Sequence, residues 1–191
     1  GASGAPGVFS LDRLRLDAGG PENYIFTAGN RIVPDGGVDT GAYYRTVVAD
    51  GAGVVRNGTS PCLPAAEFET ADNSYEVKAG DPVSTAAGWT FSLRQFSTSS
   101  CSGTPTKTAS KVFYVGRATA YNSSGATTVQ NSFRAGATAY VAVAGMPRGV
   151  SDFNVSWIGP SGAVVCANTA GADRPDADSE GKLPKGGGGV I

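Results

Sequence analysis

Short runs of alternating apolar and polar residues recur along the chain, and each is bounded by Gly, Pro, Asn or Asp. A period of two is typical of β-strands with one buried face, whereas segments with the longer period of a helix are almost missing. The plainest run begins at Trp89, where Trp89, Phe91 and Leu93 share one face and Gln95 follows them. We expect this face to be buried and the intervening residues to face solvent.

The first part of the chain contains enough such runs for a complete sandwich. Glycine-rich and proline-rich turn signals separate them at intervals of about ten residues, which favours a β-sandwich over a barrel or a propeller. The predicted strands cover residues 8–14, 42–49, 53–59, 66–70, 74–78, 89–97 and 110–117. Residues 1–7 are predicted to be a flexible segment, and residues 8–117 a first β-sandwich module.

A second series of strands begins after Arg117. It is predicted at residues 118–125, 131–136, 138–146, 153–160 and 163–169. The pattern Phe-x-Ala-Gly occurs at residues 26–29 and again at 133–136, and we expect each copy to lead into an inner strand. Residues 118–191 are therefore predicted to form a second module.

The second module is shorter than the first and ends before equivalents of the last two strands of module 1. Tyr140, Val155 and Trp157, its expected core residues, would then lack part of the opposing sheet. Exposed strand edges and an open core favour pairing with a further strand. Two explanations stay open: another chain supplies the missing strands at an interface that includes these residues, or the polypeptide continues.

The residues from Phe133 to Pro184 resemble a known family. A strand of the form F-x-x-G-x-x-x-Y-V-x-V, a W-x-x-P-x-G hairpin and an acidic D-x-D-x-x-G turn are similar to the immunoglobulin-like repeat domains of surface and secreted proteins from high-GC Gram-positive bacteria. The resemblance covers residues 118–184, and residues 8–117 only as a strand plan. It implies two tandem immunoglobulin-like β-sandwich modules that serve as stalks, spacers, adhesive tips or fibre subunits.

Composition narrows the classes of function. Fifteen Lys and Arg residues against 16 Asp and Glu residues give a formal net charge of -1, with no concentration of basic side chains, so we expect no nucleic-acid partner. The apolar stretches are shorter than the roughly 20 residues that span a bilayer, so we expect no membrane span. The chain contains no His, which removes Ser-His-Asp and Cys-His catalysis, and we expect no enzymatic activity.

Three cysteines occur, and none lies in a C-x-x-C pair. Because Cys62 and Cys101 both fall in loops of the first module, they are the preferred disulfide pair. Cys166 is left over, and both a buried free thiol and a bond to another chain remain open. Cysteine usage, the abundance of small and hydroxyl residues and the scarcity of lysine together predict an extracellular or cell-surface location.

One acidic cluster could bind calcium. Asp173, Asp176, Asp178 and Glu180 place carboxylates close together before a glycine, as in the first half of a calcium loop. The bidentate Glu at EF-hand spacing is missing, so a solvated turn between strands is the competing interpretation. We expect no other cofactor.

These observations favour an extracellular structural or adhesive protein. Its most specific form is a surface fibre (filament) subunit that assembles through β-strand pairing with itself or with other surface-protein subunits. The alternative is a polysaccharide-binding module of a larger secreted protein that binds cell-wall or environmental polysaccharide. In that case Tyr43, Tyr44, Tyr75 or Phe96 could form an aromatic platform on which sugar rings stack.

Overall fold

The computed structural model describes residues 8–16, 24–25, 28–58, 60–123, 128–134, 137–145, 155–158, 161–168 and 188–190. The chain divides into two compact units. Unit 1 is formed by Gly1–Pro82 and Gly88–Val115, and unit 2 by Val83–Ala87 and Gly116–Ile191. The described elements are nearly all strands in mostly antiparallel sheets, so the fold class is all-β, as the alternating pattern predicts.

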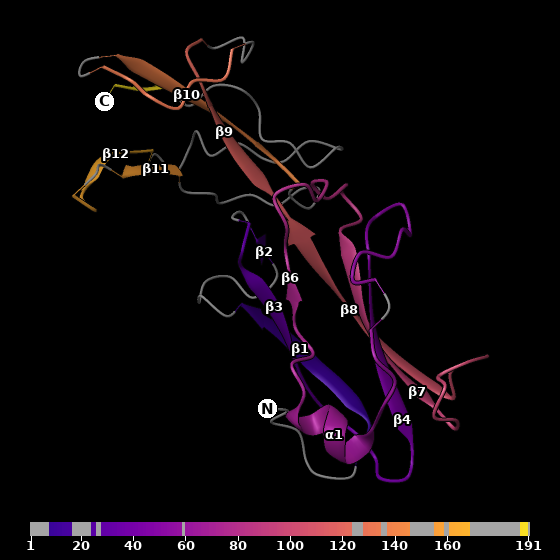
Figure 1. Cartoon of the computed structure of the whole chain (residues 1–191). Coiled ribbons are helices and arrows are strands. Elements are labelled where there is room, and N and C mark those ends of the chain that lie inside the picture. Colours follow the sequence, from indigo (N-terminus) through magenta and orange to yellow (C-terminus); the bar gives the residue numbers. More distant parts are fainter. Residues whose placement is uncertain are drawn as a thin grey trace. The chain divides into compact units, whose positions relative to one another are not determined.

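Unit 1 contains two sheets that face each other (Figure 1). Its elements are β1 (Ser10–Leu16), β2 (Tyr24–Ile25), β3 (Arg31–Gly37), β4 (Tyr43–Ala49), β5 (Leu63–Pro64), α1 (Ala65–Thr70), β6 (Tyr75–Glu76), β7 (Trp89–Phe96) and β8 (Lys107–Val115). One sheet has the strand order β1-β3-β6 and the other β2-β8-β7-β4-β5. Only β2 and β8 run parallel, and the other described neighbours in these two sheets are antiparallel.

The space between the two sheets is filled by one apolar core. Leu14 and Ile32 enter it from the three-stranded sheet, and Trp89, Phe91 and Phe113 enter it from the five-stranded sheet. Each of these side chains is at most 2% exposed, and the rings of Trp89 and Phe113 meet edge-on with centroids 5.8 Å apart. Burying a side chain of this size stabilises the fold by about 1.5–3 kcal/mol, so the β-sandwich is held mainly by this layer.

The buried face predicted for β7 is confirmed. Trp89, Phe91, Leu93 and Gln95 are buried on the side that faces the core. The opposite side does not face solvent as the pattern predicts, because Ser92 and Phe96 are also buried and Thr90 and Arg94 are half-buried. The predicted solvent-exposed face of this strand is therefore wrong, since no residue of β7 is fully exposed.

A β-bulge keeps the leucines of β1 on one face. Leu11 pairs with Gly36 and Arg13 pairs with Asp35, so Asp12 is an extra residue in the ladder. Without the bulge, the odd spacing of Leu11 and Leu14 would place them on opposite faces. Both are buried in the core as a result.

Strand β3 was not among the predicted strands. Its sequence contains Pro34 and two glycines, which normally mark turns, and a charged Asp35. Ile32 nevertheless enters the core, and Gly36 permits a close approach to β1 that leaves no space for a side chain. Tertiary packing thus overrides the local turn signal.

Two predicted strands of the first module are wrong. Residues 66–70 belong to helix α1, in which Ala65 and Phe68 are buried at the i, i+3 spacing of a helical face. Residues 53–59 contain no extended strand among their described positions, and Val55 makes only a single bridge to Ala49.

Unit 2 has five described strands. They are β9 (Arg117–Tyr121), β10 (Thr138–Ala144), β11 (Val155–Ile158), β12 (Val164–Asn168) and β13 (Gly188–Val190). The strand order is β13-β10-β9 in one sheet, and β11 and β12 form a two-stranded sheet. Residues 131–134, part of a predicted strand, lie outside any strand, whereas β13 was not predicted.

Each Phe-x-Ala-Gly copy precedes the middle strand of a three-stranded sheet, β3 in unit 1 and β10 in unit 2. At the end of the first copy, Gly29 has φ +92°, a conformation that glycine adopts without strain. Its N–H donates to the carbonyl oxygen of Val77 at 2.8 Å, which fixes the entry into β3.

Candidate functional site

The two cysteines predicted to pair are bonded to each other. The Sγ atoms of Cys62 and Cys101 lie 2.10 Å apart and their Cα atoms 5.6 Å apart, across a sequence separation of 39 residues. Cys62 immediately precedes β5, and Cys101 lies in the loop between β7 and β8. The bond therefore ties the short edge strand β5 to the β7–β8 hairpin.

The predicted calcium ligands Asp173, Asp176, Asp178 and Glu180 lie outside the described residues. Within the described part of the chain, no group of three or more His, Cys, Asp or Glu side chains could hold a metal ion. Cys166 lies on β12, where the structure describes the backbone but not the side chains.

The residues predicted for a subunit interface lie on two different sheets of unit 2. Tyr140, which is half-buried, lies on β10 and pairs with Tyr121 of β9 and with Gly188 of β13. The backbones of Val155 and Trp157 lie on β11 and pair with β12, and their side chains are outside the described part. Their role at an interface stays a prediction.

The aromatic platform suggested for sugar stacking does not form. Tyr44, Tyr75 and Phe96 are each at most 4% exposed, because they pack inside unit 1. Tyr43 alone among the four nominated rings is partly accessible. Sugar recognition by a flat stack of these aromatic rings is therefore excluded by burial.

The side of the five-stranded sheet that points away from the core carries a different set of groups. We call it the outer face. Over β4, β7 and β8 it consists of Tyr43, Arg45, Val47, Ala49, Thr90, Ser92, Arg94, Phe96, Thr108, Ser110, Val112 and Tyr114. None of these residues is acidic.

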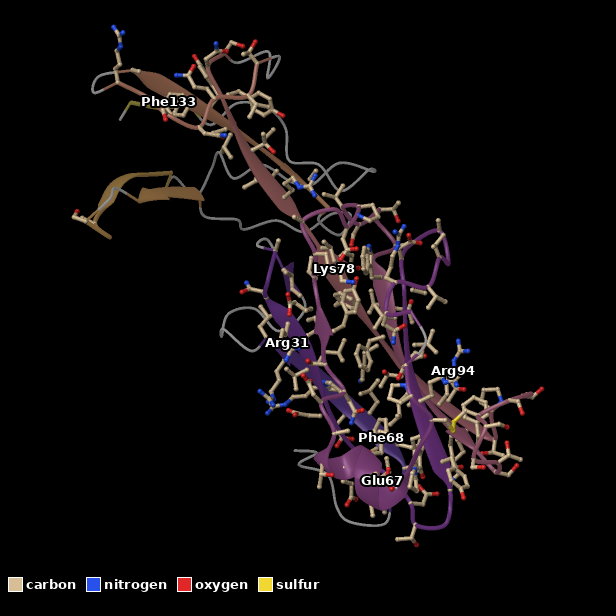
Figure 2. The ribbon with its side chains drawn as sticks, viewed as in Figure 1. Arg31, Glu67, Phe68, Lys78, Arg94 and Phe133 are labelled. Carbon is tan, nitrogen blue, oxygen red and sulfur yellow. A yellow bond between two sulfur atoms is a disulfide. The ribbon has the colours of Figure 1, made fainter. Side chains whose placement is uncertain are left out.

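Strand register arranges the outer face in rows. Arg45 of β4 pairs with Arg94 of β7, which pairs with Thr108 of β8. In the next row, the hydroxyl oxygens of Ser92 and Ser110 are 2.9 Å apart. Figure 2 shows Arg94 pointing away from the interior of unit 1. Two half-buried cationic groups thus lie beside the exposed residues Thr108 and Ser110 on adjacent strands, whereas Ser92 is buried.

Both arginines are half-buried, and Nε of Arg45 is buried without a hydrogen-bond partner in the described part of the chain. A buried N–H group without an acceptor is costly, by about 1–3 kcal/mol. On the outer face, Nε of Arg45 is thus a hydrogen-bond donor that lacks an acceptor among the described residues. The alternating sequence pattern predicted that Arg94 lies on this side of the sheet. The position of Arg45 beside it depends on the register of β4 against β7, which the sequence does not indicate.

A buried polar network lies at one end of the same sheet, on the core side. Nε2 of Gln95 donates to the Tyr44 hydroxyl at 2.8 Å and to Oδ2 of Asp39 at 3.1 Å. Lys107 also binds Asp39, and this hydrogen bond is the main reason why the pKa of Asp39 lies below its usual value. Burial raises the pKa of Tyr44, so its hydroxyl stays protonated and can donate. The network joins groups that stabilise the fold.

A cavity of about 150 Å³ lies between β3, β7 and the end of α1. Phe68, Phe91 and Leu93 contribute to its apolar lining, whereas Glu69 and Asp72 also line it and are exposed. Figure 2 shows Phe68 on α1 at this end of unit 1. A space of this size can accommodate a small apolar molecule.

No family model, curated protein or solved structure matches the chain. Within the described residues, no helix is long and apolar enough to cross a membrane.

Proposed function

We propose that the chain is a non-enzymatic extracellular structural or adhesive protein built from two immunoglobulin-like modules. The observation that carries the proposal is the Cys62–Cys101 disulfide in an aromatic-filled β-sandwich. Disulfides persist in oxidising compartments, and they stabilise domains that must keep their shape outside the cell.

Two buried carboxylates of unit 1, Asp50 and Asp35, support a structural role. Oδ1 of Asp50 accepts hydrogen bonds from the N–H groups of Ala52 and Val54, and its Oδ2 binds Arg56. This arrangement closes the turn after β4. Asp35 likewise pairs with two arginines of the neighbouring strand. These two acids hold turns and strands together. Glu69 and Asp72 line the cavity instead, and Asp72 is paired there with Arg31.

Unit 2 supports the more specific proposal of a fibre subunit. The two strands β11 and β12 form a two-stranded sheet among the described residues. An isolated two-stranded hairpin is marginally stable in water, and further strands or a packing partner stabilise it. We propose that a strand of another chain completes this module and joins subunits in a row.

Electron microscopy and cell fractionation test the function. We expect antibodies against the chain to label material outside the cell, and regular rows or fibres to contain the full chain with its disulfide intact. Recovery of the chain only from the cytosol, with Cys62 and Cys101 as free thiols, would overturn the proposal.

The two tryptophans allow a separate test of strand completion. Trp89 is fully buried in unit 1, so a Trp157→Phe variant leaves an internal reference for quenching by acrylamide. We expect Trp157 in the dispersed chain to be quenched much more than Trp89, and to become protected on assembly. A stable monomer with Trp157 already protected would contradict completion by another chain.

A further inference from the structure

The arginines of unit 1 fall into two groups. Within the described part of unit 1, four arginines have a carboxylate partner within ion-pair distance. These pairs join Arg13 and Arg15 to Asp35, Arg31 to Asp72, and Arg56 to Asp50. The other two, Arg45 and Arg94, form no ion pair with a described residue, and they lie directly opposite each other in the sheet.

The position of this pair makes it unfavourable in the absence of a ligand. Directly opposed residues on antiparallel strands have Cα atoms about 4.5–5.5 Å apart, and like charges in that arrangement destabilise the sheet. Both strands are internal in the five-stranded sheet, so the two backbones are held by neighbours on either side. An anion between the two guanidinium groups would remove the repulsion.

The chemistry of the arginines identifies the type of anion. A guanidinium group presents a planar set of N–H donors that matches the oxygens of a carboxylate. Nε of Arg45 has no acceptor in the described part of the chain, so no hydrogen bond from that nitrogen holds the side chain in place. Because Arg45 and Arg94 are directly opposed in the ladder, an oxyanion bound between them would accept hydrogen bonds from both guanidinium groups.

The hydroxyl groups beside the arginines indicate the kind of molecule to which the oxyanion belongs. Thr108 extends the row of the two arginines, and Ser92 with Ser110 forms the next row. Hydroxyl groups donate and accept hydrogen bonds, and they complement the hydroxyl groups of sugars. We propose that Arg45 and Arg94 form an oxyanion site for the carboxylate groups of an acidic polysaccharide, and that the polymer lies across the outer face.

Nucleic acid fits this surface less well. Binding to nucleic acid depends on many phosphate contacts from clustered basic residues, whereas this face offers two arginines and the chain has a net charge of -1. Acidic polysaccharide is a partner that an extracellular protein meets. The inference rests on the proposed adhesive function and specifies its ligand.

The test measures retardation of the full chain in native gels that contain polygalacturonate, with neutral dextran, inorganic polyphosphate and duplex DNA in parallel gels. We expect polygalacturonate to retard the chain most strongly and neutral dextran to have no effect. An Arg45→Gln/Arg94→Gln variant should bind at least about tenfold more weakly, because the charge-assisted hydrogen bonds to the carboxylate groups are lost. An Arg45→Lys/Arg94→Lys variant should retain part of the affinity, because the charge remains but the planar donor set is lost.

A Lys78→Gln/Lys111→Gln variant is the matched control. Both lysines are exposed and form no ion pair with a described residue, so the variant loses the same net charge elsewhere on unit 1. We expect its affinity to stay within twofold of the original chain. Unchanged thermal unfolding of the arginine variant shows that its fold is intact.

Several results would overturn the site: no retardation by polygalacturonate, equal loss in the arginine and lysine variants, or tighter binding to polyphosphate or DNA. The outcome is separable from that for the proposed function. If the chain is found in extracellular fibres but is not retarded by polygalacturonate, only the proposed ligand is ruled out. If the chain is cytosolic but is retarded, the extracellular role is ruled out.

Discussion

A Cβ atom placed on Gly36 would lie 2.2 Å from the carbonyl oxygen of Ser10 on the neighbouring strand. Leu11, which lies next to the bulge of β1, pairs with Gly36, and backbone cannot move aside as a flexible side chain can. We expect Gly36→Ala to lower the free energy of unfolding by about 1–3 kcal/mol, as overpacking does, and urea denaturation measures this.

Gly80→Ala is the control for that substitution. A Cβ at Gly80 would meet no atom within 4 Å, so its effect should stay within about 0.5 kcal/mol. Equal unfolding midpoints for the two variants would show that the close approach of β1 and β3 is not present in solution.

Removal of the disulfide should destabilise unit 1. The Cys62–Cys101 bond closes a loop of 39 residues, and the loss of loop-closure entropy in the unfolded chain predicts a stabilisation of about 4 kcal/mol. A Cys62→Ala/Cys101→Ala variant should unfold at a correspondingly lower denaturant concentration. Reducing agent should then lower the stability of the original chain but not that of the variant.

Non-reducing peptide mapping provides an independent check. The expected result is a single linked peptide pair that contains Cys62 and Cys101. A link from either residue to Cys166 would contradict the structure.

The features of this fold that could be predicted from the sequence are those that depend on residues close together along the chain. The alternation from Trp89 onwards predicted the core face of β7, and the positions of three cysteines were enough to predict the disulfide. Helix α1 was predicted as a strand, because six residues are too few to distinguish a helical period from a strand period. The i, i+3 spacing of Ala65 and Phe68 is nevertheless typical of a helix.

The missed features depend on contacts between distant residues. Strand β3 contains a charged Asp35 whose partners, Arg13 and Arg15, lie about 20 residues away on β1. The opposition of Arg45 and Arg94 follows from the pairing of β4 with β7, across the intervening β5, α1 and β6. The sequence around a residue does not predict which residue pairs with it on the neighbouring strand.

The ion pairs of Asp35 predict a loss of stability in acid. Burial alone would raise the pKa of Asp35, but hydrogen bonds and charges from Arg15 and Arg13 outweigh it and hold this pKa below 3.8. Because the pKa is lower in the folded state, the contribution to stability is present above about pH 4. It is lost as the pH falls through the folded-state pKa.

We therefore expect an Asp35→Asn variant to be less stable than the original chain at pH 7, by about 1.5–3 kcal/mol. The difference should shrink as the pH is lowered from 5 to 2, as followed by thermal unfolding at each pH. Asp12→Asn, which removes an exposed carboxylate from the same strand, should leave the profile unchanged. A constant difference between Asp35→Asn and the original chain over that range would refute the assignment.

The hydroxyl group of Tyr44 holds the buried polar network together. It donates to the carbonyl oxygen of Asp39 at 2.9 Å, and it accepts hydrogen bonds from the N–H of Asp39 at 2.9 Å and from Nε2 of Gln95 at 2.8 Å. Tyr44→Phe keeps the ring, which is 0% exposed, and removes only these bonds. We expect a loss of about 1–3 kcal/mol in the free energy of unfolding, because the amide of Gln95 loses a buried acceptor.

Tyr43→Phe is the matched substitution one residue earlier on the same strand. Tyr43 is half-buried on the outer face and makes no hydrogen bond through its side chain to a described residue, so its loss should cost less than about 0.5 kcal/mol. Amide hydrogen exchange locates the effect, since the N–H of Asp39 should lose protection in Tyr44→Phe and keep it in Tyr43→Phe. If both variants unfold like the original chain, the network contributes nothing to stability, and the core alone holds this end of the five-stranded sheet.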